Sequence, residues 1–359
     1  MGSLRLCANP LETYERREQT MTDRQVASRP PEQQPRLRYE FLEHLGSGGM
    51  ADVYRARDTE LGRDVAIKVF RDVSGTVADL TRREREIHLL GGMSHPGLVG
   101  VHDAGTLLHE GQERRYVVME LVEGLSLAHR LANGPLTPRQ AADLGAQMAD
   151  ALSYVHGRSV VHRDVKPENI LLAETPALGY TLVAKLADFG VAQFIDGARM
   201  TSDGAIMGTA AYISPEQARG EEVGPPSDVY SLGLVLLEGL RGEREYTGSA
   251  IEAALARLHR PPAVPEDLPE EWRVLLEAMT NDDPAKRPTA HEVAATLRDV
   301  IRTMILDGRG KRGRGQRSRT RPGRGDGMSV RAAAAVSSVV GATVVATVAV
   351  VTLLAGGGV

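Results

Sequence analysis

The spacing of apolar residues changes partway along the chain, and this change limits the folds that the chain can adopt. In the first third, short alternating runs separated by turn residues indicate antiparallel strands, and in the remainder the apolar residues recur at helical spacing. Strands are predicted at Tyr39–Gly46, Ala51–Arg57, Asp64–Phe70, Val99–Thr106, Arg115–Leu121 and, later, Leu182–Leu186. Helices are predicted at Val77–Gly91, Thr137–His156, Asp228–Arg241, Ile251–Arg260, Glu270–Thr280 and Ala290–Met304. A strand-rich part followed by a helix-rich part predicts an α+β fold with two lobes and a cleft between them.

The composition of the 359 residues excludes several classes of protein. Hydrophobic residues make up 42% and charged residues 25%, which is the balance of a soluble globular protein. The net charge of −4 does not predict a nucleic-acid partner. The single cysteine, Cys7, excludes a disulfide framework and a thiolate metal site, and it is consistent with a reducing, cytosolic compartment.

The first residues differ from the globular part. Residues 1–36 are polar and rich in Pro, Gln and Arg, so we predict a disordered leader without a secretory signal. Leu6 stands where a myristoylation signal needs Ser or Thr, so we expect no acyl group there. Both Met1 and Met21 remain candidates for the true start.

A basic segment and then an uncharged segment close the sequence. Nine basic residues stand against one Asp between Arg309 and Arg331, and residues 332–355 carry no charge. At about 1.5 Å per residue, such a helix can cross a hydrocarbon core of roughly 30 Å. The positive-inside pattern therefore predicts a basic Gly/Arg linker at 307–331, a transmembrane helix at 332–355 and a short outer tail at 356–359. Because small residues dominate the uncharged segment, a low-complexity tail or a buried helix is an alternative, and the Arg/Gly run also fits a nucleic-acid-binding arm.

A glycine-rich turn lies between the first two predicted strands, with the sequence Gly46-Ser47-Gly48-Gly49-Met50-Ala51-Asp52-Val53. Glycines let a backbone turn tightly and approach phosphate groups without a Cβ in the way. A strand follows the turn, whereas the dinucleotide fingerprint requires a helix there. The segment predicts either a phosphate-binding loop or an ordinary hairpin.

One lysine interrupts the third apolar strand. Lys68 follows Val65-Ala66-Ile67, and a lysine in such a place is most often at a solvated edge. Glu86 on the next predicted helix offers a carboxylate that can hold an ammonium group facing a cleft. The two residues together favour a functional lysine over a solvated one.

A charge-dense segment lies between two apolar runs in the middle of the chain. It reads His162-Arg163-Asp164-Val165-Lys166-Pro167-Glu168-Asn169, and Asp188-Phe189-Gly190 follows the next apolar strand. A carboxylate and an amide oxygen can hold Mg²⁺ on phosphate oxygens, and the remaining aspartate can receive a proton. We therefore predict a metal and phosphate site with a general base.

Taken in order, these motifs resemble those of the protein kinase superfamily over about residues 39–304. Within it the sequence looks most like the eukaryotic-like (Hanks-type) Ser/Thr kinases of bacteria, on Gly48-Gly49-Met50-Ala51, on residues 208–220 and on residues 227–233. The resemblance implies a bilobal kinase domain at 37–306 that transfers the γ-phosphoryl group of ATP to Ser or Thr of protein substrates. It also implies Mg²⁺ as the metal ion, with Mn²⁺ as an alternative.

The resemblance implies a role for each matching catalytic residue. Lys68 is expected to hold the α- and β-phosphates and to pair with Glu86. Asp164 is expected to position the substrate hydroxyl and accept its proton. Lys166 is expected to contact the γ-phosphate, and Thr209 to join Asp164 and Lys166 at the hydroxyl.

Metal and nucleotide positions follow in the same way. Asn169 and Asp188 are expected to hold the metal ions, Met119 to be the gatekeeper, and Glu120 and Val122 to offer backbone groups to adenine. The residues expected around the nucleotide are Leu45, Gly46, Ser47, Gly48, Gly49, Met50, Ala51, Val53, Ala66, Lys68, Met119, Glu120, Val122 and Leu171.

The sequence departs from the family pattern in three places. Ala51 replaces the third glycine, Ser214 replaces the alanine of Ala-Pro-Glu, and Glu245-Tyr246 stand where relatives commonly have Pro-Phe, which can alter substrate docking.

Glu216 and Arg287 match a structural buried pair. A pseudokinase normally loses a catalytic residue, and a small-molecule phosphotransferase would lack the segment 208–216, so an active protein kinase is favoured.

The resemblance also suggests how the enzyme is regulated. Arg163 precedes the catalytic aspartate and is expected to meet an anion on the activation segment. Thr201, with Ser202 beside it, is the predicted autophosphorylation site, and Asp203 would supply a permanent charge; a flexible polar loop is the alternative. We expect membrane lipids as partners of the C-terminal helix and basic linker, a homodimer for phosphorylation in trans, and no nucleic acid.

Overall fold

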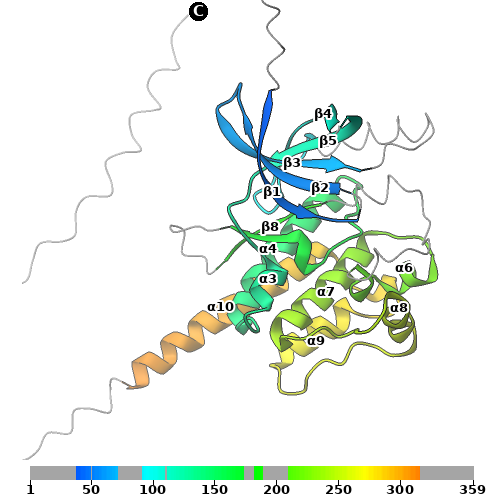
Figure 1. The fold of residues 1–359 in the computed structure, drawn as a ribbon. Coiled ribbons are helices and arrows are strands. Elements are labelled where there is room, and N and C mark those ends of the chain that lie inside the picture. Colours follow the sequence, from blue (N-terminus) through cyan, green and yellow to red (C-terminus); the bar gives the residue numbers. More distant parts are fainter. Residues whose placement is uncertain are drawn as a thin grey trace, which may run out of the picture. The chain divides into compact units, whose positions relative to one another are not determined.

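The computed structural model describes residues 38–49, 51–71, 91–109, 111–173, 182–188 and 209–315, without the side chains of 209 and 307–315 (Figure 1). Two compact units divide the chain, Met1–Gly308 and Arg309–Val359, and the elements below belong to the first unit up to residue 308. The predicted leader, the helix at 77–91 with Glu86, the phosphorylation sites and the transmembrane segment lie outside the described residues.

A five-stranded antiparallel sheet forms the first part of the fold, as the alternating pattern predicts. Its strands are β1 (Tyr39–Ser47), β2 (Ala51–Asp58), β3 (Arg63–Phe70), β4 (Val101–His109) and β5 (Gln112–Glu120), in the order β1-β2-β3-β5-β4. Gly62 and Gly111, each at positive φ, lie in the turns after β2 and between β4 and β5, where a residue with a Cβ would be strained. Short hairpins of this kind therefore pair β2 with β3 and β4 with β5.

Alternation along β3 separates the two faces of this sheet. Val65, Ile67 and Val69 pack with Tyr39 and Val118 on one face. The intervening side chains of β3 point to the opposite face because successive residues of a strand alternate. Lys68 therefore lies on the face opposite the Ile67 cluster, and it is only partly buried.

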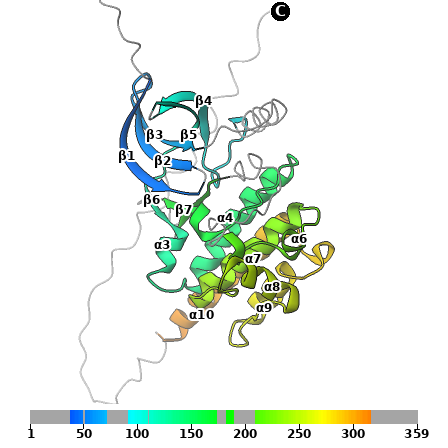
Figure 2. The same cartoon turned by 45° about the vertical axis from the view of Figure 1, so that its right-hand side comes forward.

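A second, three-stranded sheet lies beside the helices (Figure 2). It consists of β6 (Gly124–Ser126), β7 (Ile170–Ala173) and β8 (Val183–Leu186), and the short helix α3 (Leu127–Leu131) follows β6 directly. Leu98 joins Leu186 in an isolated bridge. The N–H of Ala187, directly after β8, donates to the carbonyl of Asn169, directly before β7, at 2.8 Å, so these two segments lie side by side.

The rest of the described chain is mainly helical, as predicted. Its helices are α4 (Pro138–His156), α6 (Pro215–Arg219), α7 (Pro225–Arg241), α8 (Ala250–His259), α9 (Glu270–Met279) and α10 (Ala290–Gly315), with 3-10 turns η2 (Pro167–Asn169), η3 (Thr209–Ala211) and η4 (Pro284–Lys286). Thr137 begins α4 with a reciprocal capping box to Gln140 and a proline at the first turn. These start signals can be read from the sequence, and the observed first residue of α4 is therefore only one position after the predicted one.

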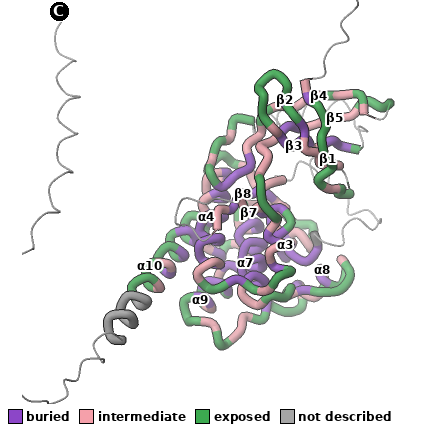
Figure 3. Tube along the Cα trace, turned by 60° about the vertical axis from the view of Figure 1, so that its left-hand side comes forward, coloured by how far each residue is buried: buried purple, intermediate pink, exposed green. Residues whose placement is uncertain are grey.

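One apolar core holds these helices together (Figure 3). The middle of α4 packs against α7, and both are buried over most of their length. Gly145 allows this close approach, since a Cβ there would lie 2.7 Å from a methyl group of Leu297 and 3.0 Å from one of Leu236. The helix spacing in this core is therefore set by a residue without a side chain.

The elements differ from the predictions in a few places. Strand β4 begins two residues later than predicted and extends to His109, and α10 extends to Gly315, beyond the predicted end of the domain at 306. The short elements β6, α3 and α6 were not predicted. Across the residues that the structure describes, no helix is both long and apolar enough to span a bilayer.

Candidate active site

Buried hydrogen bonds fix the loop that carries Asp164 between α4 and β7. The carboxylate of Asp228, on α7, accepts the backbone N–H groups of His162 at 2.8 Å and Arg163 at 2.7 Å. The His162 side chain is fully buried, and its Nε2 donates to the carbonyl of Ala187 at 3.0 Å. Arg163 has a φ of 68°, a strained conformation that these bonds stabilise. The loop is thus held from beneath by the helical core.

Two side chains contact the carboxylate of Asp164 directly. Lys166 Nζ donates to Asp164 Oδ2 at 2.8 Å, and Asn169 Nδ2 donates to the same oxygen at 3.0 Å and to the Asp164 carbonyl at 2.9 Å. Both Asn169 bonds use its amide nitrogen, which leaves its side-chain oxygen as the atom that a cation can bind. Asp164, Lys166 and Asn169 therefore lie together as predicted.

Asp188 brings a second carboxylate to this place from the end of β8. Its φ of 56° turns the chain sharply after the strand. Lys68 Nζ, from β3 of the other sheet, donates to Asp188 Oδ1 at 2.7 Å, and only 16% of the Lys68 side chain is exposed. The predicted pairing of Lys68 with Glu86 falls outside the described residues, and the partner that the structure gives to Lys68 is Asp188.

Several of the predicted nucleotide-binding residues lie on neighbouring strands of the five-stranded sheet. Val53 faces Lys68 across β2 and β3, and Ala66 faces Met119 across β3 and β5. Gly48 donates its N–H to the carbonyl of Ala51 at 2.8 Å, which closes the glycine-rich turn. Most of this turn is described, with Met50 excepted.

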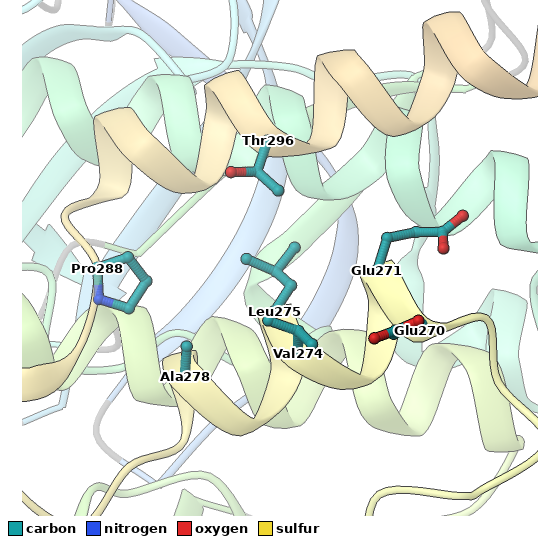
Figure 4. A pocket seen from close by; sticks show the side chains of 7 residues that line it. All are labelled: Glu270, Glu271, Val274, Leu275, Ala278, Pro288 and Thr296. Carbon is teal, nitrogen blue, oxygen red and sulfur yellow. The ribbon is translucent and has the colours of Figure 1, made fainter.

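The connection after β5 carries the predicted adenine contacts. The N–H of Glu120 donates to the carbonyl of Gly100 at 2.8 Å, which fixes the backbone at the end of β5. The Glu120 side chain pairs with Lys185 of β8 at 2.9 Å, a contact that no sequence motif predicts. Glu120, Val122 and Lys185 line a polar pocket of about 390 Å³. A larger, shallow hollow of about 580 Å³ lies elsewhere, between α9 and α10, and contains none of the predicted site residues (Figure 4).

Several buried contacts hold the segment that begins at Thr209. Arg257 of α8, itself buried, donates to the carbonyls of Ala210 and Ile213. Gln217 Nε2 donates to the Arg163 carbonyl at 3.0 Å, which ties α6 to the catalytic loop. The side chain of Thr209 is outside the described residues, so its predicted contact with Asp164 stays a prediction.

The predicted buried pair of Glu216 and Arg287 is confirmed. Arg287 donates to the two carboxylate oxygens of Glu216 at 2.7 and 2.8 Å, and Ser227 Oγ donates at 2.6 Å. Burial opposes ionisation, but the hydrogen bonds from Arg287 and Ser227 outweigh it and lower the pKa of Glu216 to about 2. The pair joins α6 to the segment before α10.

The arrangement fits Mg²⁺ and a nucleotide. Asp188 and the side-chain oxygen of Asn169 are hard oxygen ligands of the kind that Mg²⁺ prefers. Lys68 beside them places a cation where phosphate oxygens would lie, and the apolar faces of Ala66 and Met119 suit a purine base. The donor set therefore matches a metal–nucleotide complex.

Comparison with known proteins agrees with this geometry. Residues 39–297 match the protein kinase domain family. The chain is 40% identical over 272 residues to the serine/threonine-protein kinase PknB of Mycobacterium tuberculosis and 40% identical over 271 residues to PknB of Mycobacterium leprae. These alignments cover 74% of this chain and 42% and 43% of the two relatives. The serine/threonine-protein kinase PknA of M. tuberculosis is 40% identical over 268 residues, which are 72% of this chain and 61% of PknA.

The chain thus spans less than half the length of the two PknB relatives and about three fifths of PknA. The domain match covers both sheets and the helices down to α10, including every described residue of the catalytic cluster. The predicted resemblance is confirmed: the chain belongs to the protein kinase family, in its group of Hanks-type bacterial Ser/Thr kinases.

Proposed function

We propose that this protein transfers the γ-phosphoryl group of Mg-ATP to Ser and Thr hydroxyls of protein substrates. The observation that carries the proposal is that three separate segments bring together Asp164 with Asn169 and Lys68 with Asp188, the two pairs being linked by the backbone hydrogen bond from Ala187 to Asn169. Each of these groups has a role in phosphoryl transfer, and all four are present. A binding protein without activity would not need the full set.

The residues of the chain would act mainly by positioning and charge neutralisation. Lys68 would hold phosphate oxygens, and Asn169 and Asp188 would hold the metal ion, which neutralises charge on the phosphates when bound. Asp164 would orient the substrate hydroxyl. The hydroxyl oxygen forms a bond to the γ-phosphorus, the bond from that phosphorus to ADP breaks, and the hydroxyl proton passes to Asp164.

Lys166 supports this step from the same loop. Its ammonium lies 2.8 Å from Asp164 Oδ2, so it can contact the transferred phosphoryl group while it holds the carboxylate in place. Asn169 donates to the same oxygen and leaves Oδ1 of Asp164 for the substrate hydroxyl. The two donors therefore favour one orientation of the aspartate.

The activity is tested with the full chain, γ-labelled ATP, Mg²⁺ and a protein with accessible Ser and Thr residues. We expect labelled phosphoserine or phosphothreonine with wild type and almost none with Asp164→Asn. Folded wild-type protein that binds ATP but labels neither itself nor any substrate would overturn the proposal in favour of a pseudokinase.

Activation by autophosphorylation of Thr201, with Ser202 as a second acceptor, forms part of the proposal. Arg163 supports it, because its backbone is fixed by Asp228 and Gln217 and a phosphate on the activation segment needs a rigid cationic partner. Mass spectrometry of active protein tests the idea. Active protein without phosphate on Thr201 or Ser202 would contradict it.

Anchoring to the cell membrane by residues 332–355, with the kinase domain in the cytoplasm, is a further part. The uncharged length and the adjacent basic residues support it. Close approach of anchored copies would allow phosphorylation in trans. Fractionation of full-length protein beside a version ending at Asp307 tests the anchor, and equal recovery of both in the soluble fraction would refute it.

A further inference from the structure

We propose that Arg244 and Glu168 together set the preference of this enzyme for the charge of residues beside the acceptor hydroxyl of its substrate. The inference rests on the proposed kinase activity and adds a property of the substrate class. It starts from an ion pair across 76 residues, in which Arg244 Nη2 lies 3.1 Å from Glu168 Oε1. Arg244 belongs to the connection between α7 and α8, where the sequence departs from the family pattern.

The pair lies within reach of the catalytic loop. Glu168 is on η2, four residues after Asp164, so the two Cα atoms are at most about 14 Å apart. The Arg244 guanidinium lies 5.8 Å from the ring centroid of Tyr212, which follows Thr209 by three residues. Arg244 therefore bridges the catalytic loop and the substrate-binding segment. A polypeptide that presents a hydroxyl to Asp164 carries its neighbouring side chains, two to four residues away, over the same distance.

The two charges are accessible and balanced. The Arg244 and Glu168 side chains are 42% and 39% exposed, so a substrate side chain can reach both. Behind them, Glu238 is buried and accepts a hydrogen bond from the Tyr212 hydroxyl, and its Oε1 lies 3.8 Å from Arg244 Nε. Glu238 thus anchors Arg244 from inside while Glu168 neutralises it from outside.

An exposed pair of this kind is weak and can be opened by a competing charge. In wild type the two charges offset each other, so neither a basic nor an acidic neighbour is strongly selected. Removing Arg244 leaves the Glu168 carboxylate without this cation and favours basic substrates. Removing the Glu168 charge takes away the closer and more exposed of the two carboxylates beside Arg244, with Glu238 still 3.8 Å away, and so shifts the preference towards acidic substrates.

The experiment uses the full chain and three peptides that differ only in the residues beside one Thr, which are Arg, Asn or Asp. The readout is kcat/KM for the Arg peptide divided by kcat/KM for the Asp peptide. For wild type we expect a ratio within about threefold of one. Arg244→Gln should raise the ratio about two- to fivefold, and Glu168→Gln should lower it by a similar factor. The double variant should return towards wild type.

Arg298→Gln is the matched control. Arg298 and Asp150 form an ion pair of similar exposure, 45% and 37%, but the pair joins α10 to α4. Its loss should leave the ratio unchanged. The shifts of the two single variants should also shrink in 0.5 M salt, because exposed charges are then screened.

The outcomes separate this inference from the proposed function. Wild type that phosphorylates none of the peptides and no protein would count against the kinase activity itself. Active wild type with Arg244→Gln and Glu168→Gln ratios that stay the same, or move in one direction, would overturn the inference. Thermal unfolding of each variant confirms that the ratios are compared between folded enzymes.

Discussion

The five-stranded sheet and the helical part of this domain are stabilised in different ways. The sheet buries two small apolar clusters, one on each face, and most of β1 is exposed. Ion pairs at its surface supplement these clusters, among them Arg38 with Asp103, and Arg71 with Asp52. Exposed pairs of this kind contribute little, typically about 0–1 kcal/mol each.

The helical part has one continuous apolar core, and several of its polar contacts are buried within it. Asp228 and the Glu216–Arg287 pair are almost inaccessible to solvent, and both lie next to the segments that carry the site. Asp164 and Asn169 are therefore fixed by the helical part, which has the large apolar core. Lys68 and the glycine-rich turn belong to the sheet, which has only two small apolar clusters. Local opening is expected to occur first in the sheet, because it buries less.

The largest expected effects on activity come from replacing one catalytic residue in each part, Asp164 in the helical part and Lys68 in the sheet. Asp164→Asn should lower kcat about 10²–10⁴-fold with little change in the KM for ATP, because only the proton acceptor is lost. Lys68→Met should lower turnover about 10²-fold or more and also raise the KM for ATP, because Lys68 contacts phosphates. Steady-state kinetics on both variants checks this difference, and unchanged autophosphorylation in Lys68→Met would contradict the assignment.

Ion pairs provide the next comparison between the two parts. Arg287→Met should cost about 3–5 kcal/mol of unfolding free energy, because it leaves the buried Glu216 carboxylate without its partner. Arg71→Gln removes a pair that is 46% exposed on the arginine side and should cost no more than about 1 kcal/mol. Urea unfolding measures both. Equal costs would mean that the sheet depends on its surface pairs as much as the helices depend on Glu216.

The same carboxylate predicts a pH dependence. The pKa of Glu216 is about 2 in the folded protein, below its ordinary value of 4.5, so ionised Glu216 favours the folded state. This contribution is fully present above about pH 4.5 and is lost as the pH falls towards 2. The difference in unfolding free energy between wild type and Glu216→Gln should therefore shrink over this range. A difference that stays constant from pH 7 to pH 3 would show that the Glu216 charge is not involved.

Much of the fold and the site follows from local sequence, and the parts that do not have physical reasons. The Thr137-Pro138 start predicts α4 because capping is local, and Lys68 stands out because it interrupts an apolar strand. The strand β6 and the helix α3 have only 3 and 5 residues, too few to show a period.

Long-range polar contacts were the main omission within the site. Arg257 bonds to backbone carbonyls, which carry no sequence signature. Asp228, although it lies in a motif that helped to identify the family, gave no sign that it would hold the catalytic loop. The pairs Lys185–Glu120 and Arg244–Glu168 join segments 65 and 76 residues apart, and charge alone does not select one partner among many. Such contacts are decided by the packing that brings the segments together.

The smallest changes in the structure add one methyl group to each part. Gly145→Ala places a Cβ 2.7 Å from Leu297 in the helical core, and overpacking of this kind should cost about 1–3 kcal/mol, more than the gain in helix propensity. Gly46→Ala adds a Cβ at the end of β1 with no atom within 4 Å, so stability should rise or fall by less than about 1 kcal/mol.

The KM for ATP should respond in the opposite order to stability, with the larger effect from Gly46→Ala. The open space beside Gly46 is where the glycine-rich turn would approach phosphates, so Gly46→Ala should raise the KM for ATP, whereas Gly145→Ala should leave that KM unchanged in the folded fraction. Thermal unfolding and ATP titration of the two variants provide the measurements. A Gly46→Ala protein as destabilised as Gly145→Ala would show that the glycine-rich turn is packed as tightly as the helical core. The two parts would then not differ in packing at the residues that approach the nucleotide.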